Sequence, residues 1–403
     1  MLPRLRAGLD FMRSPFPDKP GLVIRDPFQF SDVTLIVPRP LVSCLTFFDG
    51  EKSSLDLRAH LVRVSGNVDS GGLEAHLTEA LSNAGFLDDE PFARRKAEAE
   101  KAFADAPLRQ PAHAGSGYPD EPAELSKTFA EYMTGVSAAP HNGTVLGIAA
   151  PHVSPFGGVD AYRAAYSALS PSDAARTVVI LGTSHYGHPA RIGLTRKPFV
   201  TPLGETTPAL DLIDELERNA AQSVLMEDYC HAIEHSIEFQ VVFLQHLLGP
   251  NIRVLPILCG SYYRSIEDGG LPEDDPAVER LIGALGELSA REGKRLLWVL
   301  GVDMAHMGKR YGDPLSAVAG QGEMGEVERR DRARIHSLAS GDARGYWELI
   351  QENQDDLKWC GSAPIYTFLK AVPEARGQLL HYQQWNIDEE SVVSFAGLRF
   401  DSR

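Results

Sequence analysis

Side chains that commonly bind metals follow three apolar segments of this chain, each within a few residues of the segment's end. They are His152 after 145–150, His185 after 177–181, and Asp303 with His306 after 296–300. In an open α/β sheet, ligands bind in the crevice beyond the carboxyl ends of the strands. A single histidine after a strand is often structural, but packing alone would favour apolar side chains or neutral caps at all of these positions. The coincidence predicts one metal site at this edge of the sheet.

Cys360 is a further candidate ligand. It stands before Gly361 and just ahead of an apolar segment at 365–369 that is expected to be helical. A helix N-terminus stabilises the thiolate, which is the form of cysteine that binds metals, although an inert packed cysteine is the alternative.

A polar cluster at 234–238 opens another expected helix. Glu234 and Glu238 are four residues apart and therefore share a face of that helix. They either orient a ligating histidine as outer-shell partners or favour the helix N-terminus through its dipole. With His235, and with Ser184 directly before His185, they form the expected second layer of the cleft.

The elements that must position these residues divide into two domains, 1–105 and 106–403. The boundary lies at the start of a stretch from Asp105 to Asp120 that contains several Pro, Gly and Ala residues. In the larger domain, near-continuous apolar strands, with a further one at 252–258, alternate with helix-length segments. This pattern indicates an α/β fold, with a sheet buried by helices on both faces.

The smaller domain is predicted to be an α+β unit. The expected elements are strands at 33–37 and 41–45 and helices near 55–62, 73–81 and 92–103. This order resembles the winged-helix-like modules that carry or recognise peptides in bacterial enzymes. A structural or oligomerising role is the alternative.

The composition predicts a cytoplasmic globular protein without nucleic-acid or membrane partners. Of 403 residues, 43% are hydrophobic and 23% are charged, as in ordinary folded proteins. The net charge of -16 would repel a phosphate backbone. Four scattered cysteines suit a reducing compartment. The first residues lack the apolar run of a signal peptide, and no segment approaches the roughly 18 apolar residues of a membrane helix.

Six motifs resemble the Memo-like family, including its members known as AmmeMemoRadiSam system protein B. They are 112–118 (AHAGSGY), 150–152 (APH), 181–185 (LGTSH), 234–238 (EHSIE), 303–306 (DMAH) and 360–365 (CGSAPI). The resemblance implies a fold similar to the class III extradiol dioxygenases, which are non-haem iron enzymes. It also implies metal ligation by His152, His185 and Cys360, with Asp303 beside the metal and His306 in the place of the catalytic base.

The same resemblance implies iron or copper as the metal and, in some members, a peptide bound in the cleft. We expect Fe(II) first, with copper or zinc as alternatives. A radical-SAM protein and an AMMECR-type protein are the implied partners. The sequence departs from the family pattern in two places. Members of the family usually have an aromatic residue where this chain has Gly117, and a slightly longer, Tyr-containing loop where it has residues 153–158.

Three functions remain open from the sequence. The first is a dioxygenase-like oxidoreductase, in which His306 takes a proton from a substrate hydroxyl and Asp303 orients its neighbours. The second is a non-catalytic module that holds a peptide or partner in the cleft. The third is a zinc hydrolase, with Glu234 or Glu238 as the base.

Overall fold

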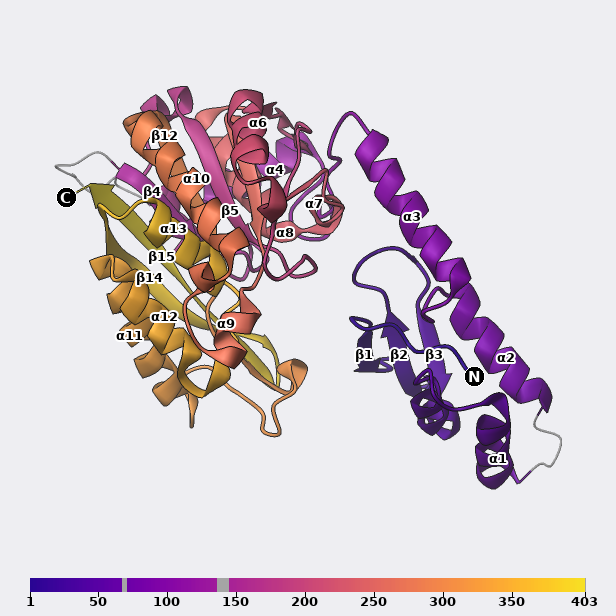
Figure 1. Cartoon of the computed structure of the whole chain (residues 1–403). Coiled ribbons are helices and arrows are strands. Elements are labelled where there is room, and N and C mark those ends of the chain that lie inside the picture. Colours follow the sequence, from indigo (N-terminus) through magenta and orange to yellow (C-terminus); the bar gives the residue numbers. More distant parts are fainter. Residues whose placement is uncertain (67–70, 136–144, 403) are drawn as a thin grey trace. The chain divides into compact units, whose positions relative to one another are not determined.

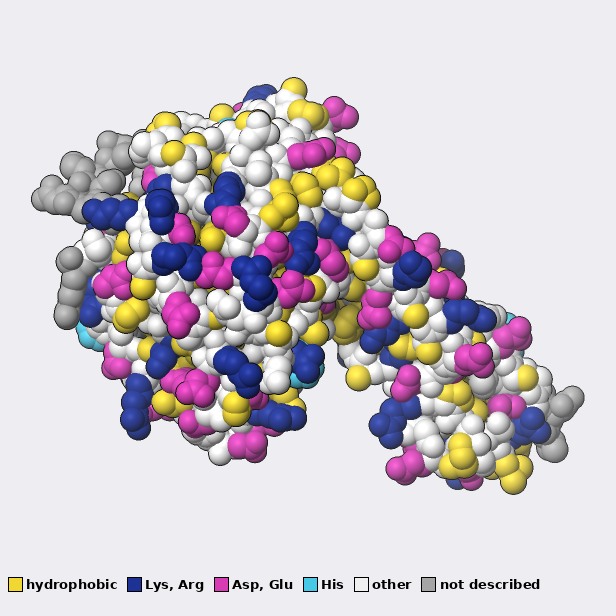
Figure 2. All heavy atoms as spheres, turned by 45° about the horizontal axis from the view of Figure 1, so that its top comes forward, with side chains coloured by type: hydrophobic (Ala, Val, Ile, Leu, Met, Phe, Trp, Pro, Cys, Tyr) yellow, Lys and Arg dark blue, Asp and Glu magenta, His cyan; other side chains and the backbone are white. Residues whose placement is uncertain are grey.

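The chain divides into two compact units, Met1–Asp105 and Ala106–Arg403 (Figure 1). The computed structural model describes residues 1–66, 71–135 and 145–402. Within these ranges, no helix combines the length and the apolar character needed to cross a bilayer. On the face shown in Figure 2, basic and acidic side chains are interspersed. That face therefore carries no large surface of a single charge.

The small unit begins with a three-stranded antiparallel sheet and continues with helices. Its elements are β1 (Asp10–Arg13), β2 (Gly21–Arg25), β3 (Leu35–Pro38), the 3₁₀ helix η1 (Arg39–Phe47), α1 (Ser54–Ser65), α2 (Gly71–Asn83) and α3 (Glu90–Asp105). Ile24, Leu61 and Leu81 are fully buried in its core. All three strands precede all three α-helices, and the winged-helix resemblance stays a prediction.

The expected strand at 41–45 is wrong, because these residues belong to η1. Pro40 lies in the first turn of this helix, where its missing N–H would have had no partner and its fixed φ is already helical. Cys44 and Leu45 are adjacent in sequence and both buried, whereas a half-buried strand would turn them to opposite faces.

The large unit is built on a ten-stranded mixed sheet. The order is β10-β6-β11-β5-β12-β4-β15-β13, and β14 pairs with β15 and β9 with β11. The strands are β4 (Val145–Ala150), β5 (Thr177–Thr183), β6 (Ile192–Leu194), β9 (Thr207–Pro208), β10 (Val224–Met226), β11 (Arg253–Cys259), β12 (Leu296–Gly301), β13 (His306–Gly308), β14 (Ala375–Asp388) and β15 (Ser391–Ser402). A separate hairpin joins β7 (Val200–Thr201) to β8 (Gly204–Glu205).

Helices cover both faces of this sheet, which confirms the predicted α/β class (Figure 1). The helices are α4 (Pro122–Tyr132), α5 (Val159–Tyr166), α6 (Leu210–Asn219), α7 (Cys230–Ile233), α8 (His235–Leu248), α9 (Tyr263–Asp268), α10 (Pro276–Glu292), α11 (Met324–Ser340), α12 (Ala343–Gln351) and α13 (Ser362–Ala371). Along β5, Val178 and Ile180 pack with α4, α5 and α8, while Val179 and Leu181 pack with α6, α10 and α13. Burial on both faces explains the continuous apolar strands.

The four central strands β11, β5, β12 and β4 run parallel and end in line. In the register, Gly182 of β5 lies opposite Gly301 of β12, and Gly301 lies opposite Ala150 of β4. The loops after β4, β5 and β12 therefore leave the sheet at one edge. This alignment brings together residues that are about 150 positions apart in the chain, such as His152 and Asp303.

Candidate metal centre

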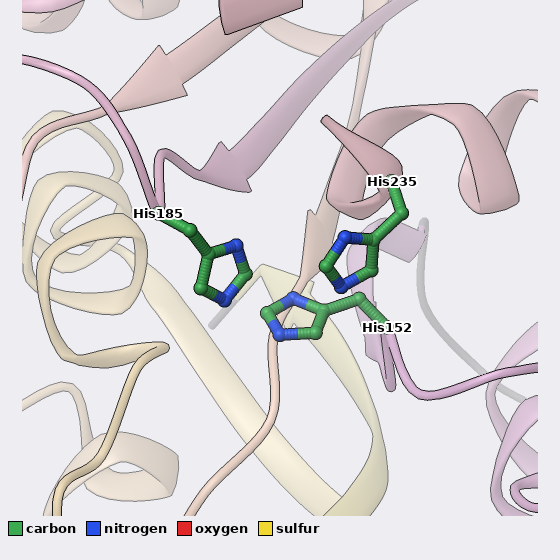
Figure 3. A group of neighbouring side chains, drawn as sticks. All are labelled: His152, His185 and His235. Carbon is green, nitrogen blue, oxygen red and sulfur yellow. The ribbon is translucent and has the colours of Figure 1, made fainter. Parts of the chain in front are cut away.

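Three histidine rings converge at this edge of the sheet (Figure 3). One ring nitrogen from each of His152, His185 and His235 lies within 4.8 Å of the other two. Ring centroids are 5.0 Å apart for His152 and His185, 5.1 Å for His152 and His235, and 5.0 Å for His185 and His235. Nitrogens bound to one ion at about 2.1 Å lie at most about 4.2 Å apart. Small side-chain movements are therefore enough to bring all three rings to one metal.

His152 is held rigidly in the loop after β4. Its Nδ1–H donates to Gly301 O at 2.9 Å, so Nε2 carries the lone pair in the neutral ring. Its backbone N–H donates to Asp303 Oδ1 at 2.9 Å. Nε2 lies 3.3 Å from Cys360 Sγ and 3.4 Å from Asp303 Oδ2. A backbone carbonyl on the far nitrogen is the usual way in which proteins aim a histidine at a metal.

One buried carboxylate, Glu234, orients the other two rings. Its Oε1 accepts from His185 Nδ1 at 3.0 Å and lies 3.2 Å from His235 Nδ1, which leaves Nε2 of both rings for a metal. Glu234 also caps α8, because the backbone N–H groups of His235 and Ser236 donate to it. Although burial alone would raise the pKa of this carboxyl, His185 and His235 hold it well below its usual range. Glu234 thus combines the two roles that the sequence offered as alternatives, because it orients histidine rings and also caps the helix α8.

Cys360 approaches from the opposite end of the chain. Its Sγ lies 3.3 Å from His152 Nε2 and 3.8 Å from Asp303 O. The loop is fixed by Thr183 Oγ1, which donates to Cys360 O at 3.0 Å, and by Gly361 N–H, which donates to Asp303 O at 3.1 Å. A Cβ at Gly361 would lie only 2.6 Å from Asp303 O. Glycine at this position therefore allows the cysteine loop to sit against the loop after β12.

The four candidate donors differ in protonation. Burial lowers the pKa of His152 to about 3, and burial also keeps the pKa of His235 well below its usual range. Burial raises the pKa of the Cys360 thiol. For His185, burial would lower the pKa, but Glu234 and the hydrogen bond with Cys360 raise it well above its usual value. At neutral pH, His152 and His235 are ready ligands, whereas His185 and Cys360 each carry a proton that metal must displace.

Asp303 and His306 border the same point. Nδ1–H of His306 donates to Met304 O at 2.9 Å and Lys358 O at 3.1 Å, so Nε2 is the free acceptor. Burial lowers the pKa of His306 to about 4 and raises that of Asp303 to about 6. At pH 7 the imidazole is neutral and the carboxyl ionised. This is the state that a proton-accepting histidine needs.

Ser184 and Glu238 lie outside the ring of donors. The buried Ser184 hydroxyl faces Gly187, whose added Cβ would lie 2.3 Å from Ser184 Oγ. Glu238 accepts from the backbone N–H groups of Ala112 and His113 at 3.0 and 2.9 Å and pairs with Arg109. Glu238 therefore holds the 112–118 segment rather than one of the three converging histidines.

A fifth histidine, His113, is brought near the site by this segment. Its ring centroid lies 5.6 Å from that of His235, and its ring pairs through Nε2 with Ile233 O at 2.9 Å. The pattern of polar residues after apolar strands does not find His113, because no strand precedes it. Phe239 fills the space in front of Gly117, where an added Cβ would lie 2.7 Å from the phenyl ring. An aromatic residue at 117 would therefore require Phe239 to move.

The match to a family covers this whole arrangement. A family model described as "Memo-like protein" matches residues 109–399. The chain belongs to the Memo-like family. It is 27% identical to a MEMO1 family protein of Aquifex aeolicus over 404 residues, which cover 99% of this chain and 100% of the relative. It is 30% identical to one of Thermococcus kodakarensis over 305 residues, which cover 73% of this chain and 99% of the relative.

The Memo-matched region contains every site residue described above. A third relative, from Methanosarcina barkeri, is 26% identical over 298 residues, 72% of this chain and 99% of the relative. The Thermococcus and Methanosarcina Memo relatives are thus about as long as the large unit alone, whereas the Aquifex relative aligns along both units.

The side chains of the Memo-like site suit a transition metal. Imidazole nitrogens and a thiolate bind iron, copper and zinc, whereas magnesium and calcium prefer oxygen ligands. Each candidate histidine has its second nitrogen directed at a carbonyl or carboxylate oxygen. The side chains of His185 and His235 keep 27% and 28% of their surface accessible, against 2% for His152. One side of the cluster is therefore open to solvent.

Proposed function

We propose that this Memo-like protein binds a redox-active transition metal, expected to be Fe(II), through His152, His185 and Cys360, with His235 as an additional ligand. The observation that carries the proposal is the convergence of three ring nitrogens within 4.8 Å, with the Cys360 thiol 3.3 Å from one of them. Copper is the nearest alternative, because a thiolate beside imidazoles also suits it.

The proposed activity is a dioxygenase-like oxidation of a substrate that carries an acidic hydroxyl group. When bound, Fe(II) would supply the redox chemistry toward dioxygen. His306 is the base in this proposal, since its Nε2 is free and its pKa of about 4 leaves it neutral at pH 7. Asp303 fixes the loop that carries His152 by accepting the His152 backbone N–H.

Replacing His306 with glutamine should lower oxidation without lowering metal content. The protein is reconstituted anaerobically with Fe(II), and dioxygen uptake is followed with catechol as a probe. Loss of a positioned base costs about 10²- to 10⁴-fold in rate, while the iron ligands remain. Wild-type protein that binds iron but takes up no dioxygen with catechol-like probes would contradict the proposed dioxygenase-like activity. Equal rates for wild type and H306Q would contradict the role of His306.

Metal binding should release protons, because the pKa values of His185 and Cys360 are raised in the metal-free site. If both become ligands, about two protons leave at pH 7 and affinity rises with pH up to about 100-fold per unit. Calorimetric titration in buffers of different ionisation enthalpy measures this number. The C360S variant should release about one proton fewer. An unchanged number in C360S would remove the thiol from the ligand set.

A second candidate function is the binding of an organic ligand such as a peptide without chemistry. It is favoured by an aromatic rim next to the site, made of Phe156, Trp385 and Tyr311. Phe156 is 63% exposed and its ring meets Trp385 at 5.8 Å, while Tyr311 meets the His306 ring at 4.9 Å. A peptide that copurifies and survives the H306Q change would favour this function.

The hydrolase alternative lacks a base at the expected positions. Glu234 is 1% exposed and already accepts from His185, His235 and Ser236. Glu238 is fully buried and paired with Arg109. Neither carboxylate is free to take a proton from water, so we do not propose hydrolysis at this site.

A further inference from the structure

A buried carboxylate outside the metal ligands connects two of the loops that form the site. Asp331 of α11 is 0% exposed. Its Oδ1 accepts from Trp359 Nε1 at 2.7 Å, and its Oδ2 accepts from Tyr382 OH at 2.8 Å and Ser394 Oγ at 2.6 Å. All three partners donate, so both carboxylate oxygens of Asp331 are engaged as acceptors. The nearby Arg334 pairs with Asp355.

The first donor fixes the cysteine loop. Trp359 is 1% exposed and directly precedes Cys360. Its backbone N–H donates to Asp355 Oδ2 at 2.8 Å, and its carbonyl accepts from Ser362 N–H at 3.1 Å at the start of α13. Trp359 is therefore held by hydrogen bonds of both its indole ring and its backbone. The position of the next residue, Cys360, follows from that of Trp359.

The second donor fixes the loop after β12. Ser394 of β15 donates to Asp331 and accepts from the backbone N–H of Ala305 at 2.9 Å through the same Oγ. Its backbone N–H donates to Ala305 O at 2.9 Å, and its carbonyl accepts from Met304 N–H at 2.8 Å. Met304 and Ala305 separate Asp303 from His306. The Asp331 carboxylate thus holds both the cysteine loop, through Trp359, and the loop after β12, through Ser394.

We infer that Asp331 is a positioning residue that sets the spacing of Cys360 relative to Asp303 and His306. This inference rests on the metal-binding function proposed above. Asp331 acts through Trp359 and Ser394, which are its direct partners. Its effect should therefore appear in the geometry of the metal–thiolate bond as well as in affinity, since outer-shell partners of ligands typically change metal affinity 10- to 100-fold.

The test uses full-length protein loaded with Co(II), whose thiolate charge-transfer absorption reports the bond to Cys360. D331N should bind Co(II) at least 10-fold more weakly in chelator competition and should shift or weaken that absorption. D26N is a matched control in the small unit. Asp26 is also buried and accepts from Arg6, Phe28 and Ser31, which all belong to the small unit.

Two milder variants keep the test decisive if D331N does not fold. W359F and Y382F each remove one donor to Asp331, but only Trp359 adjoins Cys360. W359F should lower Co(II) affinity and shift the absorption, and Y382F should leave both near wild type. Equal effects of the two variants, or an unchanged spectrum in D331N, would overturn the inference while leaving the metal site intact. Wild-type protein that binds no Co(II), Fe(II) or Cu would overturn the proposed function as well.

Discussion

Replacing His152 with alanine should abolish stoichiometric metal binding, with a loss of at least 100-fold in affinity. His152 is the most deeply buried of the three histidines, with 2% of its side chain exposed against 27% for His185 and 28% for His235. Its ring is within 5.1 Å of both other rings, and its Nε2 faces the Cys360 thiol at 3.3 Å. Its removal withdraws a neutral ligand that needs no deprotonation at pH 7. The remaining donors would then have to hold the ion across the gap that the ring leaves.

The measurement is metal content by elemental analysis, followed by chelator competition with Fe(II) under anaerobic conditions. H246A is the matched control, because His246 is a partly buried histidine at the far end of α8 that packs on Phe129. It should bind metal as the wild type does. H235A separates the two ligand sets, since a loss well above 100-fold makes His235 a direct ligand and a loss of about 10- to 100-fold makes it an outer-shell partner. An unchanged metal content and affinity in H152A would refute the proposal that these histidines bind the metal.

The strand ends could be predicted from the sequence for a physical reason. A strand buried on both faces is mainly apolar, so a charged or imidazole side chain just beyond the apolar run marks where the chain leaves the sheet. The register confirms that β4, β5 and β12 leave at the same edge. His152 and Asp303, predicted to be neighbours on this basis, are joined by a hydrogen bond of 2.9 Å.

The roles of His235, Glu238 and His113 could not be read in the same way. Their placement depends on the direction of side chains at the first turn of α8 and on a long-range pairing. Glu238 is one helical turn beyond Glu234, yet it faces Arg109, and the segment that Arg109 begins then brings His113 to His235. These contacts join residues more than 100 positions apart, and neither a strand end nor a helical repeat in the sequence predicts them. The strand expected at 41–45 is wrong for a local reason, because Pro38 at the N-cap and Pro40 in the first turn favour the start of the helix η1.

The two units differ in what they contribute to the Memo-like site. Every donor and its hydrogen-bond partner lies within the large unit. The Thermococcus relative is matched over 99% of its own length by 73% of this chain. A chain of that size is therefore long enough to hold the whole site, and the small unit is an addition shared with the Aquifex relative.

Replacing Arg109 with methionine should destabilise the large unit by about 3–5 kcal/mol, since it leaves a buried charge without its partner. The side chains of Arg109 and Glu238 are both 0% exposed and form an ion pair. Arg109 also donates to His231 O at 2.8 Å and Glu234 O at 3.2 Å, next to the residues that carry the site. Burial would raise the pKa of Glu238, but Arg109, His113 and the hydrogen bond from Tyr118 together lower it, so the carboxylate is ionised at pH 7.

Urea unfolding followed by tryptophan fluorescence measures this effect in the large unit alone. All four tryptophans, Trp298, Trp347, Trp359 and Trp385, belong to Ala106–Arg403. E238Q should also destabilise the unit, because it leaves the buried Arg109 guanidinium without its counter-charge, and R109M/E238Q should cost less than the sum of the two single changes. The folded pKa of Glu238 is lowered, so the ion pair's contribution is present at neutral pH and is lost as pH falls through that value. R109M with unchanged stability at pH 7, or strictly additive single changes, would show that the pair does not hold the 109–118 segment against α8.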